Sequence, residues 1–334
     1  MGLAVKIEKL KADSLKKYLI GMSSYDFSRV PIGTGKFVYF PVSKKISIPN
    51  GTYVSRALKK SEKKVSIKDF FKNEKDSKLL KNSYDIVGSV AIIEVPKAMV
   101  KKERQIANYL LSIHPSVKTI VKKSGGHSGS FRIQKYKFLS GLKNFETQYT
   151  EFGLKFFFDI RKTYFTPRLA SERERIAKLI KPGERVLVMF SGVAPYPLVF
   201  SRLSKAKEII GIEINPNAHK FAIENIKRNK ISNVKVFIGD VRKVLPKLGG
   251  KFDRIVMPLP KTAKKFLPFA FKFANKGAVI HYYEFSDDVP QGTIKLVNEI
   301  LKKQKVKGRV LQVVKAGQNA PYFYRVCADI ELGK

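Results

Sequence analysis

From Leu169 onward, apolar strand-like runs alternate with helical segments, and this alternation constrains the fold more than any other feature. Runs such as Arg185–Phe190 and Glu208–Ile214 are rich in Val and Ile, and a helical segment follows each. Parallel sheets covered by helices on both faces have this pattern. Two later runs, Arg309–Gly317 and Pro321–Leu332, lie close enough in sequence to pair as an antiparallel edge. We predict an α/β domain over residues 166–334 with a mostly parallel, Rossmann-like sheet.

The preceding residues predict two small α+β domains. In residues 1–55 we expect a strand at Ala4–Leu10, a helix at Ala12–Met22 and a strand at Lys36–Val42. The polar, basic stretch Gly51–Lys64 is a predicted linker, with the domain boundary at 56–65.

The second small domain is predicted over residues 66–165. Asp85–Pro96 is strand-rich, and a helix follows with Ile106, Tyr109, Leu110 and Ile113 on one face. Two strands are expected around the Gly/Ser-rich turn within Thr119–Gly141, and another strand pair within Phe152–Pro167. The next helix should begin at Ser171 as its N-cap.

The charge of the chain points to a polyanionic partner. There are 66 Lys and Arg against 27 Asp and Glu, a formal net charge of +39, and residues 1–150 contribute 30 basic and 11 acidic side chains. The excess is therefore spread over the chain, and such a field attracts nucleic acid. A general lysine bias with solvated faces is the alternative. A membrane surface is disfavoured, because the chain has no basic amphipathic helix with a clean apolar face.

Cysteine content and the lack of a targeting segment limit the compartment. Cys327 is the one cysteine, which excludes a disulfide framework and a cysteine-based metal site. The four histidines are scattered, so no metal site is expected. Without a signal peptide or an apolar run near 20 residues, the protein is expected to be soluble and cytoplasmic.

Four strand ends carry candidate cofactor-binding residues, and ligands bind at the carboxyl ends of such strands. The first is Phe190–Val193, where Gly192 permits close approach of a ligand. Glu213 follows 21 residues later, a spacing suited to gripping ribose hydroxyls. Asp240 is placed to accept from an adenine amino group. The fourth end is the proline-rich Met257–Pro260.

Each strand end alone is weak, because a single glycine after a strand is most often only a turn. A dinucleotide site usually shows G-x-G-x-x-G, whereas here Gly192 is followed by Pro195 and Pro197. S-adenosylmethionine has no pyrophosphate, so one glycine suffices. The four ends taken in order favour S-adenosylmethionine, and the antiparallel C-terminal edge suits that class of methyltransferase.

On these residues the chain resembles the archaeal and eukaryotic-type tRNA guanine-37 N1-methyltransferases over about 85–330. The matching motifs are Phe131–Ile133, Thr166–Leu169, Glu172–Arg173, Met189–Pro195, Gly211–Asn215, Gly239–Val241, Met257–Pro260 and His281–Phe285. The resemblance implies that the N-terminal domain contacts the outer corner of tRNA, the middle domain binds the anticodon arm, and the last domain binds S-adenosylmethionine. It implies cofactor contacts from Arg173, Phe190, Ser191, Gly192, Val193, Glu213, Ile214, Asp240 and Val241.

Two departures from the family pattern narrow the resemblance. Val188, Met189 and Ser191 replace the usual acid and alanine near the glycine loop, and Pro258 stands where members commonly have Asn. Together with Tyr196-Pro197, Pro258 resembles the archaeal subgroup linked to wyosine synthesis. Such members methylate N1 of guanosine and also C7 of the tricyclic base 4-demethylwyosine.

Methylation of guanine N1 requires a base near N1 and a positive donor near O6, because N1 carries a proton at neutral pH. The resemblance assigns Glu172 as the base and Arg132 as the donor. From the residues alone, Glu172 equally fits a first-turn helix acid, and Arg132 a phosphate contact or a solvated strand residue. Arg168, Arg173 and Arg175 near Glu172 oppose the raised pKa that a base needs. The loop carbonyl of Pro258 is a candidate acceptor for the base edge.

A base in the anticodon loop must leave its stack to react, so backbone contacts have to hold the tRNA. Tyr282 or Tyr283 is a candidate for stacking the extruded base, with an ordinary core tyrosine equally suitable. The candidate RNA-binding cations are Lys122, Lys123, Lys135, Lys137 and Arg168, and a solvated strand face is the alternative for them. We expect a monomer that acts on tRNA. The functional alternatives are aminocarboxypropyl transfer to the same base and a catalytically inactive tRNA-binding protein.

Overall fold

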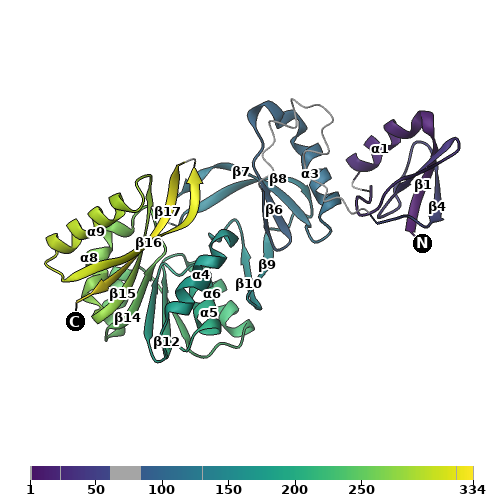
Figure 1. Cartoon of the computed structure of the whole chain (residues 1–334). Coiled ribbons are helices and arrows are strands. Elements are labelled where there is room, and N and C mark those ends of the chain that lie inside the picture. The colour runs from purple at the N-terminus through teal and green to yellow at the C-terminus, as the bar shows by residue number, and fades with distance from the viewer. Residues whose placement is uncertain (1, 23, 61–83, 130, 321, 334) are drawn as a thin grey trace. The chain divides into compact units, whose positions relative to one another are not determined.

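The computed structural model describes residues 2–22, 24–60, 84–129, 131–320 and 322–333. The chain divides into two compact units, Met1–His127 with Gln134–Thr147, and Ser128–Ile133 with Gln148–Lys334 (Figure 1). Each unit contains its own buried apolar cluster. The limits of three domains at 1–55, 66–165 and 166–334 stay a prediction.

The first unit begins with a four-stranded antiparallel sheet in the order β2-β3-β1-β4. Val5, Leu15, Leu19 and Phe40 belong to its core, which explains why the sheet covers α1. Its elements are β1 (Gly2–Glu8), a 3₁₀ turn η1 (Lys9–Lys11), α1 (Ala12–Gly21), β2 (Ile32–Thr34), β3 (Phe37–Pro41) and β4 (Thr52–Arg56).

β4 corrects the predicted linker over Gly51–Lys64. The residues Thr-Tyr-Val-Ser-Arg include the β-branched and aromatic types that are common in strands. They pair with β1 from Leu3↔Ser55 to Lys6↔Thr52. The flanking lysines concealed this short strand, since polar edges are usual for a strand at the side of a sheet. Residues 61–64 of the predicted linker lie outside the described residues.

The same unit contains a second four-stranded sheet in the order β5-β6-β7-β8. The predicted helix face is confirmed, because Ile106, Tyr109 and Leu110 are buried, and the predicted strands around the Gly/Ser-rich turn form β7 and β8. The elements are β5 (Asp85–Val87), β6 (Val90–Ile93), a 3₁₀ segment η3 (Lys97–Lys102), α3 (Glu103–Ile113), β7 (Thr119–Ser128) and β8 (Ile133–Gly141).

A two-stranded sheet of β9 (Glu146–Glu151) and β10 (Leu154–Asp159) follows. The strand pair predicted within Phe152–Pro167 is therefore wrong in its position. Only β10 lies there, and its partner is upstream, because the tight turn occurs at Phe152, with φ of 50°, and Gly153, with φ of 74°.

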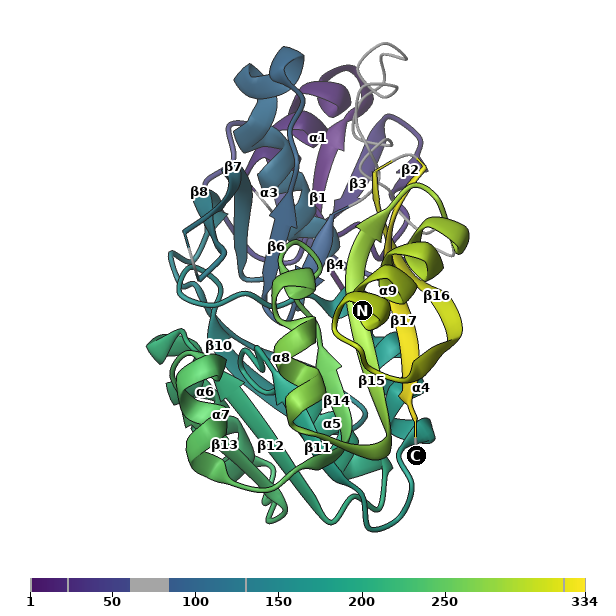
Figure 2. The same cartoon turned by 90° about the vertical axis from the view of Figure 1, so that its left-hand side faces the viewer.

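The seven-stranded sheet of the second unit has the order β13-β12-β11-β14-β15-β17-β16 (Figure 2). Neighbouring strands in the run β13-β12-β11-β14-β15 are parallel, whereas β17 pairs antiparallel with both β15 and β16. This confirms the predicted Rossmann-like sheet with an antiparallel C-terminal edge. The strands are β11 (Arg185–Met189), β12 (Glu208–Glu213), β13 (Val234–Ile238), β14 (Phe252–Met257), β15 (Ala274–Ser286), β16 (Gly308–Ala320) and β17 (Phe323–Leu332).

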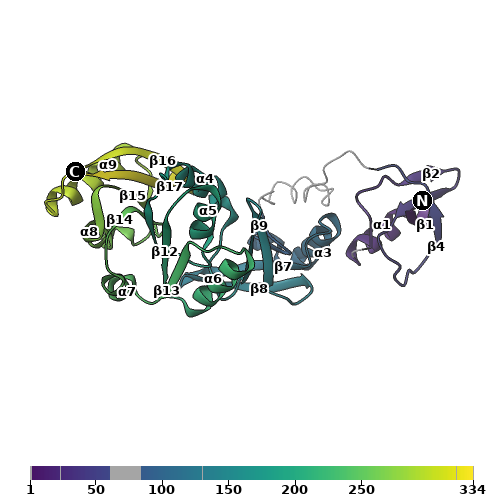
Figure 3. The ribbon, with the colours of Figure 1, turned by 90° about the horizontal axis from the view of Figure 1, so that it is seen from below.

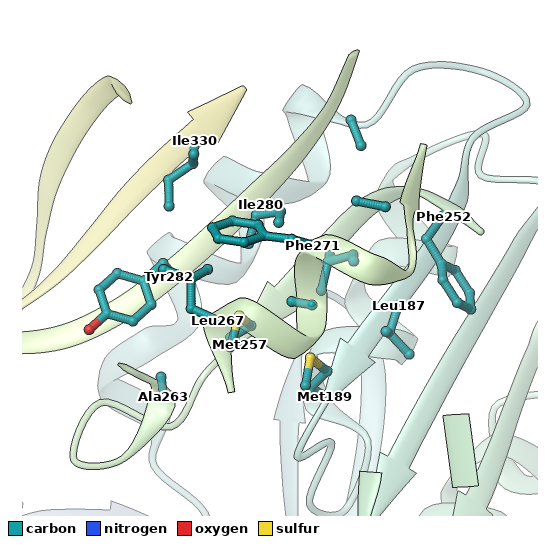
Figure 4. Packing of buried hydrophobic residues seen from close by; sticks show 14 of the residues in the cluster. Leu187, Met189, Phe252, Met257, Ala263, Leu267, Phe271, Ile280, Tyr282 and Ile330 are labelled. Carbon is teal, nitrogen blue, oxygen red and sulfur yellow. The ribbon is translucent and has the colours of Figure 1, made fainter. Parts of the chain in front are cut away.

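Helices cover both faces of this sheet (Figure 3). Leu187, Met189, Met257 and Ile280 pack with residues of α7, α8 and α9 in one apolar cluster (Figure 4). Alternate strand residues point to the opposite face, where α5 and α6 contact β12 and β13. The helices are α4 (Ala170–Leu179), α5 (Pro195–Leu203), α6 (Pro216–Arg228), α7 (Val241–Leu248), the 3₁₀ turn η5 (Ala263–Lys265), α8 (Leu267–Lys272) and α9 (Gln291–Lys303).

The start of α4 differs from the prediction that Ser171 is its N-cap. A 3₁₀ turn, η4 (Pro167–Leu169), precedes the helix, and the Thr166 side chain accepts a hydrogen bond from the Arg168 backbone N–H. Pro167 fixes its own φ and so favours entry into the turn at this point. Ser171 consequently lies inside the first turn of α4. Within the described parts of the chain, no helix is long and apolar enough to cross a membrane.

Candidate active site

The loops that follow the parallel strands lie along one edge of the sheet. The register pairs Met189 with Ile212, and Glu213 with Ile238, so the first three strands end at nearly the same level. Met257 ends β14 on the other side of β11. The four predicted strand ends therefore meet at the carboxyl edge, where α/β sheets bind ligands.

The loop between β11 and α5 has an unusual backbone. Phe190, Gly192 and Ala194 are left-handed, with φ values of 63°, 57° and 66°. For Phe190 and Ala194 this conformation costs about 1 kcal/mol or more. A Cβ built on Gly192 would meet the backbone oxygen of Tyr164 at 3.8 Å, so glycine is needed here for its backbone angle more than for space. Val193 is fully buried and anchors the loop.

Glu213 fixes the shape of this loop. One carboxylate oxygen accepts from the Gly192 backbone N–H at 2.7 Å, and the other accepts from the Asn215 backbone N–H at 2.8 Å. Burial raises the pKa of the Glu213 carboxyl, although the backbone donors oppose this rise. The sequence predicts that Glu213 binds ribose, and the structure adds that the same carboxylate holds two neighbouring loops together.

Ser191, within the same loop, has a buried hydroxyl whose hydrogen bonding is unsatisfied. Its Oγ is buried and has no hydrogen-bond partner among the described residues. A Cβ on Gly211 of β12 would come within 2.9 Å of this oxygen, so glycine is required at position 211. A buried hydroxyl without a partner usually marks a place where a water or ligand is bound.

Two exposed apolar side chains flank the ends of β12 and β13. Ile214 is 42% exposed and Ile238 is 51% exposed, which is unusual for isoleucine beside a buried sheet. Such surfaces suit the face of a planar base. Ile214 is a predicted site residue, whereas Ile238 was not identified from the sequence. Its position directly before Gly239-Asp240 is the signal that was available.

Asp240 performs a local structural task at the third strand end. Its carboxylate accepts from the backbone N–H of Arg242 at 2.9 Å, which caps α7, and it pairs with the Arg242 side chain at 2.5 Å. The hydrogen bond from Arg242 lowers the pKa of the Asp240 carboxyl. Val241, another predicted cofactor residue, has its side chain in the apolar core, so only its backbone is available to a ligand.

Glu172 is buried at the same edge and is held by side chains. Both of its oxygens accept from the Arg175 guanidinium, at 2.8 and 2.9 Å. One of them also accepts from the Tyr283 hydroxyl at 2.7 Å. Tyr196 in turn donates to the Tyr283 oxygen at 3.1 Å. Tyr196, the first residue of the Tyr196-Pro197 pair noted in the sequence, is therefore linked to Glu172 through Tyr283.

The register places Pro258 near this group. Tyr282 is the β15 partner of Met257, the residue before Pro258, so Pro258 follows at the level of Tyr283. The Leu259 backbone N–H donates to the Met257 carbonyl at 2.7 Å, which closes a tight turn around the proline. The register thus puts Pro258 at the level of Tyr283, whose hydroxyl donates to Glu172. A site shared by Glu172 and Pro258 stays a prediction.

Arg173 forms a buried ion pair that the sequence did not predict. Its guanidinium is 1% exposed and forms two bonds to Glu151 of β9, at 2.7 and 2.5 Å. It also lies over the rings of Phe165 and Tyr196. The solvated alternative is inconsistent with this burial, whereas the predicted contact with the cofactor stays a prediction. Arg173 ties α4 to the β9–β10 hairpin, and Glu151 was not identified from the sequence.

Arg132 is half-buried in a left-handed backbone conformation, with φ of 53°. Burial lowers the pKa of its guanidinium, the nearby Tyr164 hydroxyl raises it, and the charge of Arg325 lowers it again. Arg325 donates to the Tyr164 hydroxyl at 3.4 Å. Nothing in the sequence indicated that Arg325 of β17 supplies a second guanidinium near Arg132. The structure groups Arg132 with Tyr164 and Arg325, and groups Glu172 with Arg175 and Tyr283.

The predicted lysine patch is partly neutralised by acids. Lys122 and Lys137 both pair with Glu103 of α3, and Lys123 pairs with Glu94. Lys135 is exposed on β8. The patch therefore consists of three ion-paired lysines and the exposed Lys135 on β7 and β8, and the acidic partners come from elements that the sequence did not link to these strands.

Two further predicted RNA contacts have contrasting environments. Tyr282 is 1% exposed and belongs to the apolar cluster, and its hydroxyl donates to Glu284 at 3.1 Å. Its ring offers no open face for a base, so the core alternative describes it. Arg168 is exposed in the turn before α4.

Comparisons with known proteins agree with this arrangement. Residues 147–310 match the TRM5/TYW2 methyltransferase domain, and residues 67–144 match the TYW2 N-terminal domain. The tRNA (guanine(37)-N(1))-methyltransferase Trm5b of Pyrococcus abyssi is 32% identical over 99% of both chains. The tRNA (guanine(37)-N(1))/4-demethylwyosine(37)-methyltransferase Taw22 of Nanoarchaeum equitans is 30% identical over 75% of this chain and 96% of that protein.

Solved structures give the same result. The complex of aTrm5 with tRNALeu aligns with a TM-score of 0.71 and 29% identity, covering 99% of this chain and 100% of that one. TYW2 of Methanocaldococcus jannaschii in complex with AdoMet aligns with a TM-score of 0.57 and 25% identity, covering 75% of this chain and all of that one. With the carboxyl-edge geometry and the match over nearly its whole length, this chain belongs to the TRM5/TYW2 methyltransferase family.

Proposed function

We propose that this protein is an S-adenosylmethionine-dependent tRNA methyltransferase that forms N1-methylguanosine at position 37. The observation that carries the proposal is a buried carboxylate, Glu172, held by Arg175 and Tyr283 in a chain that matches a guanine-37 N1-methyltransferase over 99% of its length. A tRNA-binding protein without activity would not need a buried, oriented acid at the carboxyl edge.

The residues at the first three strand ends fit S-adenosylmethionine. The unsatisfied Ser191 hydroxyl, the left-handed Gly192 and the exposed Ile214 and Ile238 provide a polar and apolar surface side by side. Glu213 and the backbone of Phe190, Val193 and Val241 complete the proposed contacts, with Asp240 toward the adenine. When bound, S-adenosylmethionine supplies an electrophilic methyl group on a sulfonium and leaves as a neutral thioether.

The protein has to move one proton during methyl transfer. A Glu172 oxygen would take up the N1 proton of guanine as N1 gains the methyl group that bound S-adenosylmethionine would supply. Negative charge that develops on O6 is stabilised by the Arg132 guanidinium. Because Arg132 is partly desolvated, its charge acts more strongly there than it would in water.

Basic side chains spread over the chain hold the tRNA while the target base is out of its stack. We place the anticodon arm against the second sheet of the first unit, where Lys135 and Lys137 are exposed. Arg168 of the second unit is a further proposed RNA contact. Residues 1–55 contact the outer corner of the tRNA. The enzyme acts as a cytoplasmic monomer, and no metal takes part.

The loop at Pro258 favours a second substrate, 4-demethylwyosine, methylated at C7. Proline has no side-chain donor, so this loop makes fewer demands on the base edge than the asparagine common in the family. The similarity to Taw22 supports the same proposal. Of the two reactions, N1-methylation is the one for which the proposed roles of Glu172 as base and Arg132 as donor are written.

The test is mass spectrometry of two tRNAs after incubation with enzyme and S-adenosylmethionine. A transcript with guanosine at position 37 should gain one methyl group, and nuclease mapping should place it on that nucleotide. A tRNA carrying 4-demethylwyosine tests the second substrate. An unmodified first transcript, or addition of an aminocarboxypropyl group in place of methyl, contradicts the proposed function.

Arg132→Ala tests the donor role. Loss of a charged donor to the developing oxyanion should lower the single-turnover rate by about 100-fold, with calorimetric affinity for S-adenosylmethionine little changed. Lys135→Ala is the matched control, since it removes a cation from the same strand region without touching the reacting base. Equal losses in the two variants would remove Arg132 from the chemistry.

A further inference from the structure

Arg175 is shared between two buried carboxylates. Besides its two bonds to Glu172, it donates to Asp329 of β17 at 2.7 and 3.2 Å. The Asp329 side chain is 2% exposed, and that of Glu172 is 5% exposed. One guanidinium therefore faces two negative charges inside the protein, although a single bidentate pair would use its charge fully.

Asp329 is held as an anion from its other side. It accepts from His281 Nδ1 at 2.6 Å and from Gln312 Nε2 at 2.8 Å. Burial works to raise the pKa of Asp329, but the hydrogen bonds from His281 and Arg175 and the charge of Arg175 outweigh it and hold this pKa well below its usual range.

The proton on His281 is located by its neighbours. Arg254 lies 2.8 Å from Nε2, and a guanidinium can only donate. His281 Nε2 must therefore accept, so the one ring proton is on Nδ1 and points to Asp329. Burial lowers the pKa of His281 in agreement with a neutral ring. Arg254 is in turn paired with Glu184 at 2.7 Å.

His281, Cys327 and Asp329 offer ligand atoms within 4.8 Å of one another, but the surroundings do not suit a cation. Two guanidinium groups, from Arg175 and Arg254, contact this cluster directly. Both ring nitrogens of His281 are already used. The cluster is better described as the inner end of a charge network that reaches Glu172.

The charges of this network do not cancel. With His281 neutral, Glu172, Asp329 and Glu184 carry three negative charges against two positive charges on Arg175 and Arg254. The network therefore carries one excess negative charge. Because Arg175 donates to both Glu172 and Asp329, its positive charge is divided between the two carboxylates. Arg175 is therefore not a partner of Glu172 alone.

We propose that Asp329 is a positioning residue that holds part of the Arg175 charge away from Glu172, so that Glu172 stays able to accept the N1 proton. The inference rests on the proposed function of Glu172. Asp329 does so through Arg175, without touching the base. The titratable and charged groups that face Glu172 are Arg175 on its own helix, Tyr283 of β15, Tyr196 of α5, and Cys327 and Asp329 of β17.

The test is the pH dependence of single-turnover methylation in Asp329→Asn. Removing a negative charge favours the anionic form of the carboxyl that must lose its proton before reaction. The acid limb of the profile should therefore move to lower pH, by about one unit. The plateau rate should fall about threefold, because a weaker base accepts the proton less readily. An unshifted limb contradicts the proposal, whatever happens to the rate.

Glu151→Gln is the matched control, because Glu151 also forms a buried bidentate pair with an arginine of α4. It should lower the melting temperature and leave the acid limb in place. If Asp329→Asn does not fold, Asp329→Ser removes the same charge and leaves room for water beside Arg175. A shift of the limb in Glu151→Gln equal to that in the Asp329 variant would show a general effect of instability.

A second measurement separates this inference from the proposed function. Carbon NMR of protein labelled at the glutamate carboxyls, with Glu172→Gln to assign the signal, follows the titration of Glu172 directly in wild type and Asp329→Asn. A midpoint lower in Asp329→Asn supports the inference even if no N1-methylguanosine is formed. Coincident midpoints overturn it even if the methylation assay succeeds.

Discussion

Two glutamates at the carboxyl edge of the second unit are buried by different means. Glu213 accepts from the backbone N–H groups of Gly192 and Asn215, whereas Glu172 accepts from the side chains of Arg175 and Tyr283. Because backbone N–H groups are present whatever the side chains are, the hydrogen bonds of Glu213 depend on the conformation of its two loops. Side-chain donors carry charge and can be substituted, so the environment of Glu172 is set residue by residue. A binding role suits the first arrangement, and a chemical role suits the second.

Glu172→Gln is the sharpest way to break this comparison. The amide keeps the shape of the side chain but cannot take up a proton, so single-turnover methylation should fall by about 1,000-fold or more. Affinity for tRNA should stay within about threefold, because Glu172 is buried and adds little to the surface that the tRNA contacts. Filter binding and rapid-quench kinetics measure the two quantities, and a variant that methylates at the wild-type rate removes Glu172 from the mechanism.

Glu213→Ala should act on binding and leave the chemistry of bound substrate largely intact. It deprives two loop N–H groups of their acceptor and removes the proposed ribose partner, so affinity for S-adenosylmethionine should fall by about 10- to 100-fold. Calorimetric titration gives the affinity, and single-turnover rates at saturating cofactor give the chemistry. An unchanged affinity would exclude Glu213 from the cofactor site.

Tyr283→Phe probes the side-chain arrangement more gently. It removes one neutral hydrogen bond to Glu172 and leaves the Tyr196 hydroxyl without its partner, so the single-turnover rate should change by about three- to tenfold. Tyr18→Phe, which removes an exposed hydroxyl that donates to the Ser47 carbonyl, serves as the control. A rate equal to that of the control would show that Tyr283 does not orient Glu172.

The pH dependence of stability gives the smallest effect and distinguishes the two glutamates in another way. Burial raises the pKa of Glu213 above its reference value of 4.5. Protonated Glu213 is thus favoured by folding, so its contribution to stability is present below that reference value and is lost as pH rises through the folded-state pKa. Thermal melts from about pH 4 to about pH 7 should show wild type losing stability relative to Glu213→Gln. A parallel pair of curves would contradict this assignment.

Much of the fold could be predicted because its signals are local. The alternation of Val- and Ile-rich runs with helices identified the seven strands of the large sheet, and the helical period identified the buried face of α3. β4 was missed because the lysines around Thr52–Arg56 resemble a linker, and the partner of β10 was sought on the wrong side of its turn.

The site was less predictable, because its contacts join distant residues. Arg173 and Glu151 are 22 positions apart, and Arg175 and Asp329 are 154 apart. In the sequence of a helix, an arginine that will be buried against such a distant partner cannot be distinguished from an exposed arginine. The strand ends could be found from glycine, proline and acid positions, but the side chains that orient Glu172 could not.

The insertion of β17 between β15 and β16 has a consequence for synthesis of the chain. β17 follows both of its neighbours in sequence, yet it pairs with β15 from Val279↔Glu331 to Ser286↔Tyr324 and carries Asp329 into the interior. During translation, β15 therefore waits with an unpaired edge of backbone groups while α9 and β16 are made. Unpaired edges invite pairing with other chains, so a nascent chain paused before β17 should be the form of this protein most dependent on chaperones.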